Sequence, residues 1–199
     1  MTARPRVYLA GPEVFLPDAL AVGAEKCRLA AAAGFEGVFP LDATLDLTGL
    51  PPAEQATRIA LANEGLMRSC DALVANLTPF RGASMDAGTA FEVGFMRSLG
   101  RPVAGYTNAI ADYAGRSRAL RDRGAITGDC DREDVAIEEF GLAENLMLEI
   151  AIRASGCRIV RTDVAQPRRM QDLTGFAACL GQLQGLFPGA RPAAPKPVG

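Results

Sequence analysis

Short apolar segments alternate along this chain with longer segments of helical periodicity, and this alternation constrains the fold more than any other feature. The apolar segments have the length of strands and span residues 7–10, 37–40, 72–77, 101–106 and 158–161. Strands that alternate with helices indicate βαβ units, in which right-handed crossovers join parallel strands. We therefore predict an α/β fold, a flavodoxin-like or Rossmann-like layered fold with a five-stranded parallel sheet flanked by helices. Ligands in such folds bind at the carboxyl ends of the strands.

The length of 199 residues fits one domain with a sizeable core. We predict that residues 1–187 form this domain and that the Pro/Ala-rich tail, residues 188–199, is disordered. Residues 107–135 mix Gly, Asp and Arg and are predicted to form a long loop with short helical pieces. Besides a helix that begins near Asp86, helices are predicted at about residues 18–33, 53–69, 143–154 and 168–186.

The chain contains no histidine, which excludes several kinds of catalytic site. Ser-His-Asp and Cys-His catalysis and zinc sites with imidazole ligands all need this residue. Acid–base chemistry must therefore come from carboxylates, Tyr, Cys or Lys. The sequence also lacks the G-x-x-x-x-G-K-[ST] and G-x-G-x-x-G phosphate-binding patterns. We expect neither a metal nor an organic cofactor.

Charge and cysteine content indicate the environment of the protein. The net charge is −2, which gives no reason to expect binding to nucleic acid or to an anionic membrane. Five cysteines without a C-x-x-C pair fit reduced thiols better than a disulfide framework. The first residues form no apolar signal segment, and no apolar run is long enough to span a bilayer. We therefore expect a cytoplasmic protein.

Two acids stand close together between residues 76 and 95, where a strand, a turn-rich loop and a helix follow one another. Asp86 lies where the helix should begin, and Glu92 lies six residues later. An apolar stripe, expected to face the core, is formed by Ala87, Ala90, Phe91, Gly94 and Phe95. Helical side chains lean toward the N-terminus, so Glu92 should point over a glycine-floored surface toward Asp86. Two converging carboxylates suit glycosyl chemistry, although an Asp at this position is also an ordinary helix N-cap.

This stretch resembles the signature of the nucleoside 2-deoxyribosyltransferase family. Three further segments resemble that family in the same order and approximate spacing: VYLAGPEVF at residues 7–15, CDALVANL at 70–77 and FGLAENLML at 140–148. Each segment alone is a weak signal, but the four in register, from about residue 6 to 150, are specific.

The resemblance implies base exchange on 2-deoxyribose, with free bases and 2′-deoxynucleosides as small-molecule partners. Glu92 would attack C1′ and form a covalent deoxyribosyl-enzyme, and Tyr8 would hydrogen-bond and orient this nucleophile. Asp71 and Asp86 match family acids around the nucleoside. Asp71 is assigned most of the base recognition and proton donation, with help from Asp86, which could also contact the sugar.

The resemblance also implies shared active sites in a homo-oligomer built from dimers. Asn145 and Met147 match residues that approach the 5′-hydroxyl from a neighbouring subunit. Gly11 and Phe15 are expected to bind substrate within the same subunit, and Phe15 could stack on the base.

Two alternative functions remain open. One is hydrolysis of the N-glycosidic bond of nucleosides or of nucleoside 5′-monophosphates. Relatives that act on monophosphates carry serines where this chain has Asp86 and Asn145, so these two residues favour a free 5′-hydroxyl. The other alternative is a non-catalytic nucleotide-binding module on the same fold.

Overall fold

The computed structural model of the protein describes residues 3–42, 45–126 and 134–190. Its sheet has five strands in the order β2-β1-β3-β4-β5, and every neighbouring pair is parallel. The strands are β1 (Arg6–Ala10), β2 (Glu36–Val38), β3 (Ala72–Asn76), β4 (Val103–Thr107) and β5 (Ile159–Arg161). This is the doubly wound order of flavodoxin-like folds, so the predicted fold class is confirmed.

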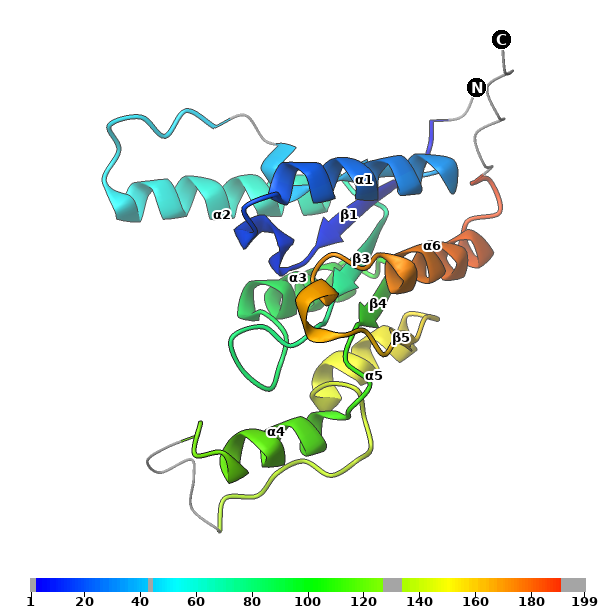
Figure 1. Ribbon diagram of the computed structural model, residues 1–199. Coiled ribbons are helices and arrows are strands. Elements are labelled where there is room, and N and C mark those ends of the chain that lie inside the picture. Colours follow the sequence, from blue (N-terminus) through cyan, green and yellow to red (C-terminus); the bar gives the residue numbers. More distant parts are fainter. Residues whose placement is uncertain (1–2, 43–44, 127–133, 191–199) are drawn as a thin grey trace.

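Helices cover both faces of the sheet (Figure 1). Helices α1 (Ala19–Ala32) and α6 (Thr174–Leu186) contact each other and one face, whereas α3 (Ala87–Ser98) and α5 (Leu146–Ala154) pack together on the other face. Helix α2 (Pro52–Arg68) lies beside α3. Helix α4 (Tyr113–Asp122) lies away from the sheet, at the bottom of Figure 1. Short 3-10 turns are η1 (Pro12–Phe15), η2 (Pro40–Asp42) and η4 (Gln166–Arg168).

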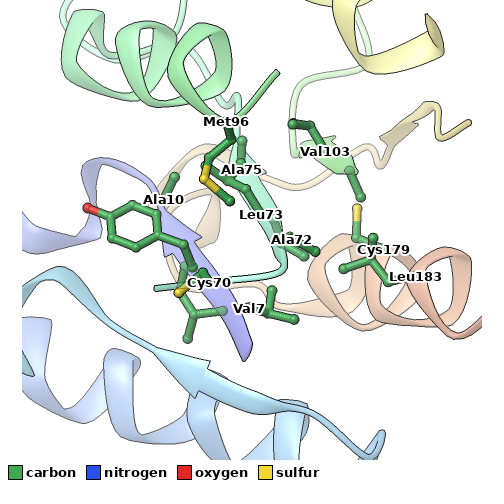
Figure 2. Packing of buried hydrophobic residues seen from close by; sticks show 14 of the residues in the cluster. Val7, Ala10, Cys70, Ala72, Leu73, Ala75, Met96, Val103, Cys179 and Leu183 are labelled. Atoms are coloured by element: carbon green, nitrogen blue, oxygen red, sulfur yellow. The ribbon is translucent and has the colours of Figure 1, made fainter. Parts of the chain in front are cut away.

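The core lies between the sheet and its helices. Every residue of β3 and β4 is buried, as expected for central strands covered on both faces. In Figure 2, Met96 from α3 packs beside Leu73 and Ala75, whereas Cys179 and Leu183 from α6 approach Ala72. Burying a side chain such as Leu73 contributes about 1.5–3 kcal/mol.

The buried face of α3 differs from the predicted one. Thr89, Val93 and Met96 are buried, whereas Phe91 is 57% exposed. The predicted stripe was therefore wrong: it mostly faces solvent and the neighbouring helices. Glu92 follows Thr89 by three residues and precedes Met96 by four, so it lies at the border of the buried face. The packing of α3 on β3, which the helical pattern alone did not reveal, decides this orientation.

The last helix begins later than predicted because backbone carbonyls before it are engaged elsewhere. The amide of Asn108 donates to the carbonyls of Arg169 and Asp172, at 2.7 and 2.8 Å. These bonds fix an irregular segment between η4 and the start of α6 at Thr174.

Some predictions fall partly outside the described residues. Phe187 packs edge-on against Phe35 at a centroid distance of 5.9 Å, but most of the predicted tail, residues 191–199, is not described. Cys70, Cys157 and Cys179 are buried free thiols, and Cys130 lies outside the described part of the chain. In that part, no helix has the length and apolar character needed to cross a membrane.

Candidate active site

A pocket of about 280 Å³ lies at the carboxyl end of β1. The turn after β1, the start of α3 and one face of α2 form its walls, and the lining residues are Gly11, Val14, Phe15, Pro40, Leu41, Ile59, Asn63, Asp86, Gly88, Thr89 and Glu92. Its volume is close to the lower limit for small-molecule sites. Most of its lining is apolar, and two carboxylates provide the charge.

Glu92 is the most perturbed group of this pocket. The hydroxyl of Tyr8, at the middle of β1, donates a hydrogen bond of 2.8 Å to Oε1 of Glu92. Burial raises the pKa of Glu92 from 4.5 to about 7; the Tyr8 hydrogen bond opposes this rise, while the nearby charge of Asp86 adds to it. The same burial and the carboxylate raise the pKa of Tyr8, which therefore stays protonated as a donor. The carboxyl of Glu92 is thus about half ionised at neutral pH.

Asp86 caps α3 and faces the same pocket. Its Oδ2 accepts a hydrogen bond of 3.0 Å from the backbone N–H of Thr89, as in an ordinary N-cap. Residue 88 is glycine, and a Cβ there would come within 2.9 Å of this oxygen. Asp86 therefore caps α3 and lines the pocket at the same time.

A buried carboxylate beneath the pocket wall leaves no space for a side chain at Gly11. Glu13 is fully buried, and its Oε1 accepts hydrogen bonds of 2.9 Å from Asn76 and Tyr106. Lys26, also fully buried, forms an ion pair with it. A Cβ at Gly11 would lie 2.0 Å from Oε2 of Glu13, so a larger residue cannot fit without moving this network.

Phe15 forms an aromatic wall at the pocket mouth. The residue is 55% exposed, and its ring stacks on Phe80, with centroids 5.5 Å apart and planes 11° apart. The guanidinium of Arg81 lies 5.0 Å from the Phe15 ring and 4.6 Å from the Phe80 ring. Arg81 has a φ of 57°, the only positive φ of a non-glycine residue in the described chain. These contacts join the turn after β1 to the loop after β3 across the pocket mouth.

A comparison with known proteins identifies the family of this chain. The family model described as nucleoside 2-deoxyribosyltransferase matches residues 7–147. This chain belongs to that family. An uncharacterised protein of Schizosaccharomyces pombe, C191.05c, is 36% identical over 166 residues, which cover 76% of this chain and 79% of that protein.

Solved structures with the same fold include a protein of the same family. The 2-desoxiribosyltransferase of Leishmania mexicana is 27% identical, with a TM-score of 0.59, and the match covers 89% of this chain and 97% of that one. A conserved protein of Enterococcus faecalis V583 shares the fold with a TM-score of 0.53 and 20% identity, over 91% of this chain and 99% of that one.

Asp71 does not line the pocket of this deoxyribosyltransferase-family chain. Asp71 precedes β3 and so lies at the amino end of that strand, opposite the edge where the pocket opens. Its Oδ2 accepts a hydrogen bond of 2.8 Å from the backbone N–H of Arg6, and its Oδ1 is 3.5 Å from Arg101. Asp71 and the pocket of this subunit therefore lie at opposite ends of the strand, and the contact of Asp71 with the base stays a prediction.

Asn145 and Met147 also lie outside the pocket lining of the described chain. Asn145 caps α5, and its Oδ1 accepts a hydrogen bond of 3.0 Å from the N–H of Met147, while its amide donates to Glu138 at 2.8 Å. Met147 is 71% exposed. The contact of Asn145 and Met147 with a neighbouring subunit's substrate stays a prediction.

Asn63 and Ile59 line the pocket but were not predicted as site residues. Both lie on α2, four residues apart and therefore on one face of the helix. The only signal in the sequence was a polar Asn within an otherwise amphipathic pattern, which does not reveal which helix face meets the pocket. Among the described residues, no group of three or more Cys, Asp or Glu side chains is placed to hold a metal ion.

Proposed function

We propose that this protein transfers 2-deoxyribose between nucleobases through a covalent deoxyribosyl intermediate on Glu92. The observation that carries the proposal is the partly buried Glu92 carboxyl, held by the Tyr8 hydroxyl in a pocket at the carboxyl edge of the sheet. Family membership supports the same reaction.

The reaction has two displacements at C1′. In the first, an oxygen of ionised Glu92 bonds to C1′ while the bond from C1′ to the base nitrogen breaks, and the base leaves with the electron pair and gains a proton. In the second, a nitrogen of the incoming base bonds to C1′ and loses its proton, and the Glu92 carboxylate is released. Two inversions give net retention, as in retaining glycosidases.

The neighbours of Glu92 suit this sequence. A partly buried carboxylate with a pKa of about 7 is a stronger nucleophile than a fully exposed one and is still partly ionised at neutral pH. The Tyr8 hydrogen bond fixes one oxygen, which leaves the other free for C1′. We assign proton exchange with the base or contact with the sugar to Asp86, and a hydrogen bond to the base to the amide of Asn63. Asp71 has no part in the proposal because it lies at the opposite end of β3.

The preferred substrate is a nucleoside with a free 5′-hydroxyl. No lysine or arginine lines the pocket within the described chain, and Asp86 and Glu92 would repel a phosphate dianion. A 5′-monophosphate is therefore disfavoured. Hydrolysis is the second candidate activity, because water can attack the same covalent intermediate when no base is present.

We further propose a homo-oligomer built from dimers, in which Asn145 and Met147 reach the substrate of the neighbouring subunit. An exposed apolar surface supports this assembly. It lies on the adjacent helices α3 and α5 and includes Phe91 (57% exposed), Met147 (71%) and Ile150 (49%). A monomer would leave these side chains in water. Mixing inactive Glu92→Gln and Asn145→Ala subunits should restore part of the activity if sites are shared; no recovery from a verified mixed oligomer would contradict sharing.

Product chromatography tests the proposed function directly. The enzyme is incubated with 2′-deoxyinosine and either adenine or cytosine, and new deoxyadenosine or deoxycytidine is expected. Glu92→Gln should abolish exchange, whereas Glu25→Gln, a matched change on the exposed side of α1, should leave it intact. Hypoxanthine without a new nucleoside would replace the transferase with a hydrolase, and no reaction at all would contradict both activities.

A further inference from the structure

A second cavity lies behind the loop that carries Asp86. Its volume is about 530 Å³, and its walls include Pro79, Ala83, Arg116, Leu120, Arg123 and Arg169. The loop between β3 and α3 separates it from the candidate active site, since Asp86 lines the first pocket while Pro79 and Ala83 line the second. Residues of α4 and of the segment before α6 close the other sides.

Positive charge is concentrated around this second cavity. Residues 113–123 and residues 158–169 each contain four arginines and one aspartate. Three of these arginines, Arg116, Arg123 and Arg169, line the cavity, and Arg116 is paired with Glu144. Both segments contribute lining residues. Asp122 is the one acidic side chain in the lining. The concentration of arginine indicates an anionic ligand.

Two guanidinium groups have nitrogens available for such a ligand. Arg123 and Arg169 each use Nε to donate to a backbone carbonyl, that of Ala119 at 3.0 Å and that of Val164 at 2.8 Å. No carboxylate in the described residues forms an ion pair with either group. A guanidinium with its Nε held by a carbonyl keeps its two terminal nitrogens for bidentate recognition of phosphate.

Arg116 connects the cavity wall to the loop. Its Nε donates to the carbonyl of Ala83 at 2.6 Å, and its ion pair with Glu144 has an N–O distance of 3.2 Å. Glu144 in turn accepts hydrogen bonds from Ser84 Oγ at 2.7 Å and from the N–H of Met85 at 3.1 Å. Met85 directly precedes Asp86, so a ligand that contacts Arg116 acts on the segment that places Asp86.

We propose that this second cavity binds a small polyphosphate anion through Arg123 and Arg169, and that binding alters turnover through the loop before Asp86. The binding is independent of the proposed function, whereas the effect on turnover rests on it. Two guanidinium groups that line one cavity can each bind a different phosphate group of the same ligand. Apolar contacts from Pro79 and Leu120 leave room for an organic part such as a nucleoside.

Calorimetric titration of the full-length protein with inorganic tripolyphosphate tests the binding. One saturable site per chain is expected, and Arg123→Ser/Arg169→Ser should weaken it by about tenfold or more, because the variant lacks two charged hydrogen-bond donors to the phosphates. The double variant Arg28→Ser/Arg97→Ser removes the same charge from exposed positions outside the cavity lining and should bind normally. Absence of saturable binding, or equal weakening in the control variant, would overturn the proposal.

Two further measurements separate the parts of the proposal. A parallel titration with 2′-deoxyadenosine 5′-triphosphate distinguishes an organic ligand from a bare polyphosphate. If this nucleotide binds more tightly than tripolyphosphate, and Arg123→Ser/Arg169→Ser removes the binding, the site is a nucleotide site. If the two ligands bind equally, the site recognises the phosphate chain alone. Saturating tripolyphosphate should change kcat/KM of base exchange in the parent protein and not in the same variant. An unchanged rate despite saturation would overturn the coupling and leave the proposed function untouched.

Discussion

Replacing Tyr8 by phenylalanine isolates the contribution of one hydrogen bond to the ionisation of Glu92. Tyr8 is fully buried, and the 2.8 Å bond to Glu92 is the one side-chain hydrogen bond of its hydroxyl in the described structure. Phenylalanine keeps the ring and its packing. The change therefore removes a donor to Glu92 and leaves the strand and the core in place.

The size of the effect follows from the strength of the bond. A hydrogen bond to a charged group contributes about 1.5–3 kcal/mol, and one pKa unit corresponds to about 1.4 kcal/mol. The bond stabilises ionised Glu92, so its loss should raise the pKa of Glu92 further above its present value of about 7. The acid limb of kcat/KM should then move upward by about one to two pH units. At pH 7 most of the nucleophile would be protonated, while at pH 9 about half to nine-tenths of it would be ionised and activity should recover in proportion.

The assay is the pH profile of kcat/KM for exchange between 2′-deoxyinosine and adenine. Tyr113→Phe is the matched control, because Tyr113 lies on α4 outside the pocket lining. An acid limb that stays at the same pH in Tyr8→Phe would refute the assignment of that limb to Glu92. A uniform loss of activity at every pH would refute the argument that the hydroxyl acts through ionisation.

Three further predictions concern individual residues. Burial raises the pKa of Glu92 from 4.5 to about 7, so its ionisation destabilises the native state by up to about 3 kcal/mol above pH 7 and has no effect below about pH 4. Glu92→Gln should therefore raise the free energy of unfolding at pH 8 but not at pH 4. Urea denaturation at the two pH values measures this difference. Equal effects at both pH values would contradict this reasoning. Asp71→Asn should keep kcat/KM within a few-fold, because Asp71 lies away from the pocket, and a hundredfold loss would return it to the active site. Gly11→Ala should lower the free energy of unfolding by about 1–3 kcal/mol, because its Cβ would meet Glu13 at 2.0 Å, and wild-type stability would contradict that packing.

The strands of the sheet follow from patterns that are local in sequence, whereas the contact of Tyr8 with Glu92 was expected from the family resemblance. Each strand was visible as a short apolar run, and the parallel order followed from the helices between them. Tyr8 lies on the first strand and Glu92 in the helix after the third. These two strands are neighbours in the sheet, so the two side chains could be expected near the same edge.

Other features depend on tertiary packing that the sequence does not reveal. Asp71 matched a family segment, but that segment spans a whole strand, and Asp71 lies at its amino end, whereas the pocket lies at the carboxyl edge of the sheet. Asn63 is placed by the path of α2 past α3, which no periodicity encodes. The apolar stripe that includes Phe91 was expected in the core, yet Phe91 is 57% exposed because the packing of α3 on β3 buries another face of the helix.

Mass spectrometry of the acid-quenched enzyme, taken during turnover of 2′-deoxyinosine, tests the central claim most directly. The account predicts one anhydro-2-deoxyribose attached per modified chain, located on the peptide that contains Glu92, and lost when adenine is added before the quench. The Glu92→Gln variant should carry no adduct. An adduct on another residue, or base exchange with inversion at C1′, would contradict Glu92 as the nucleophile.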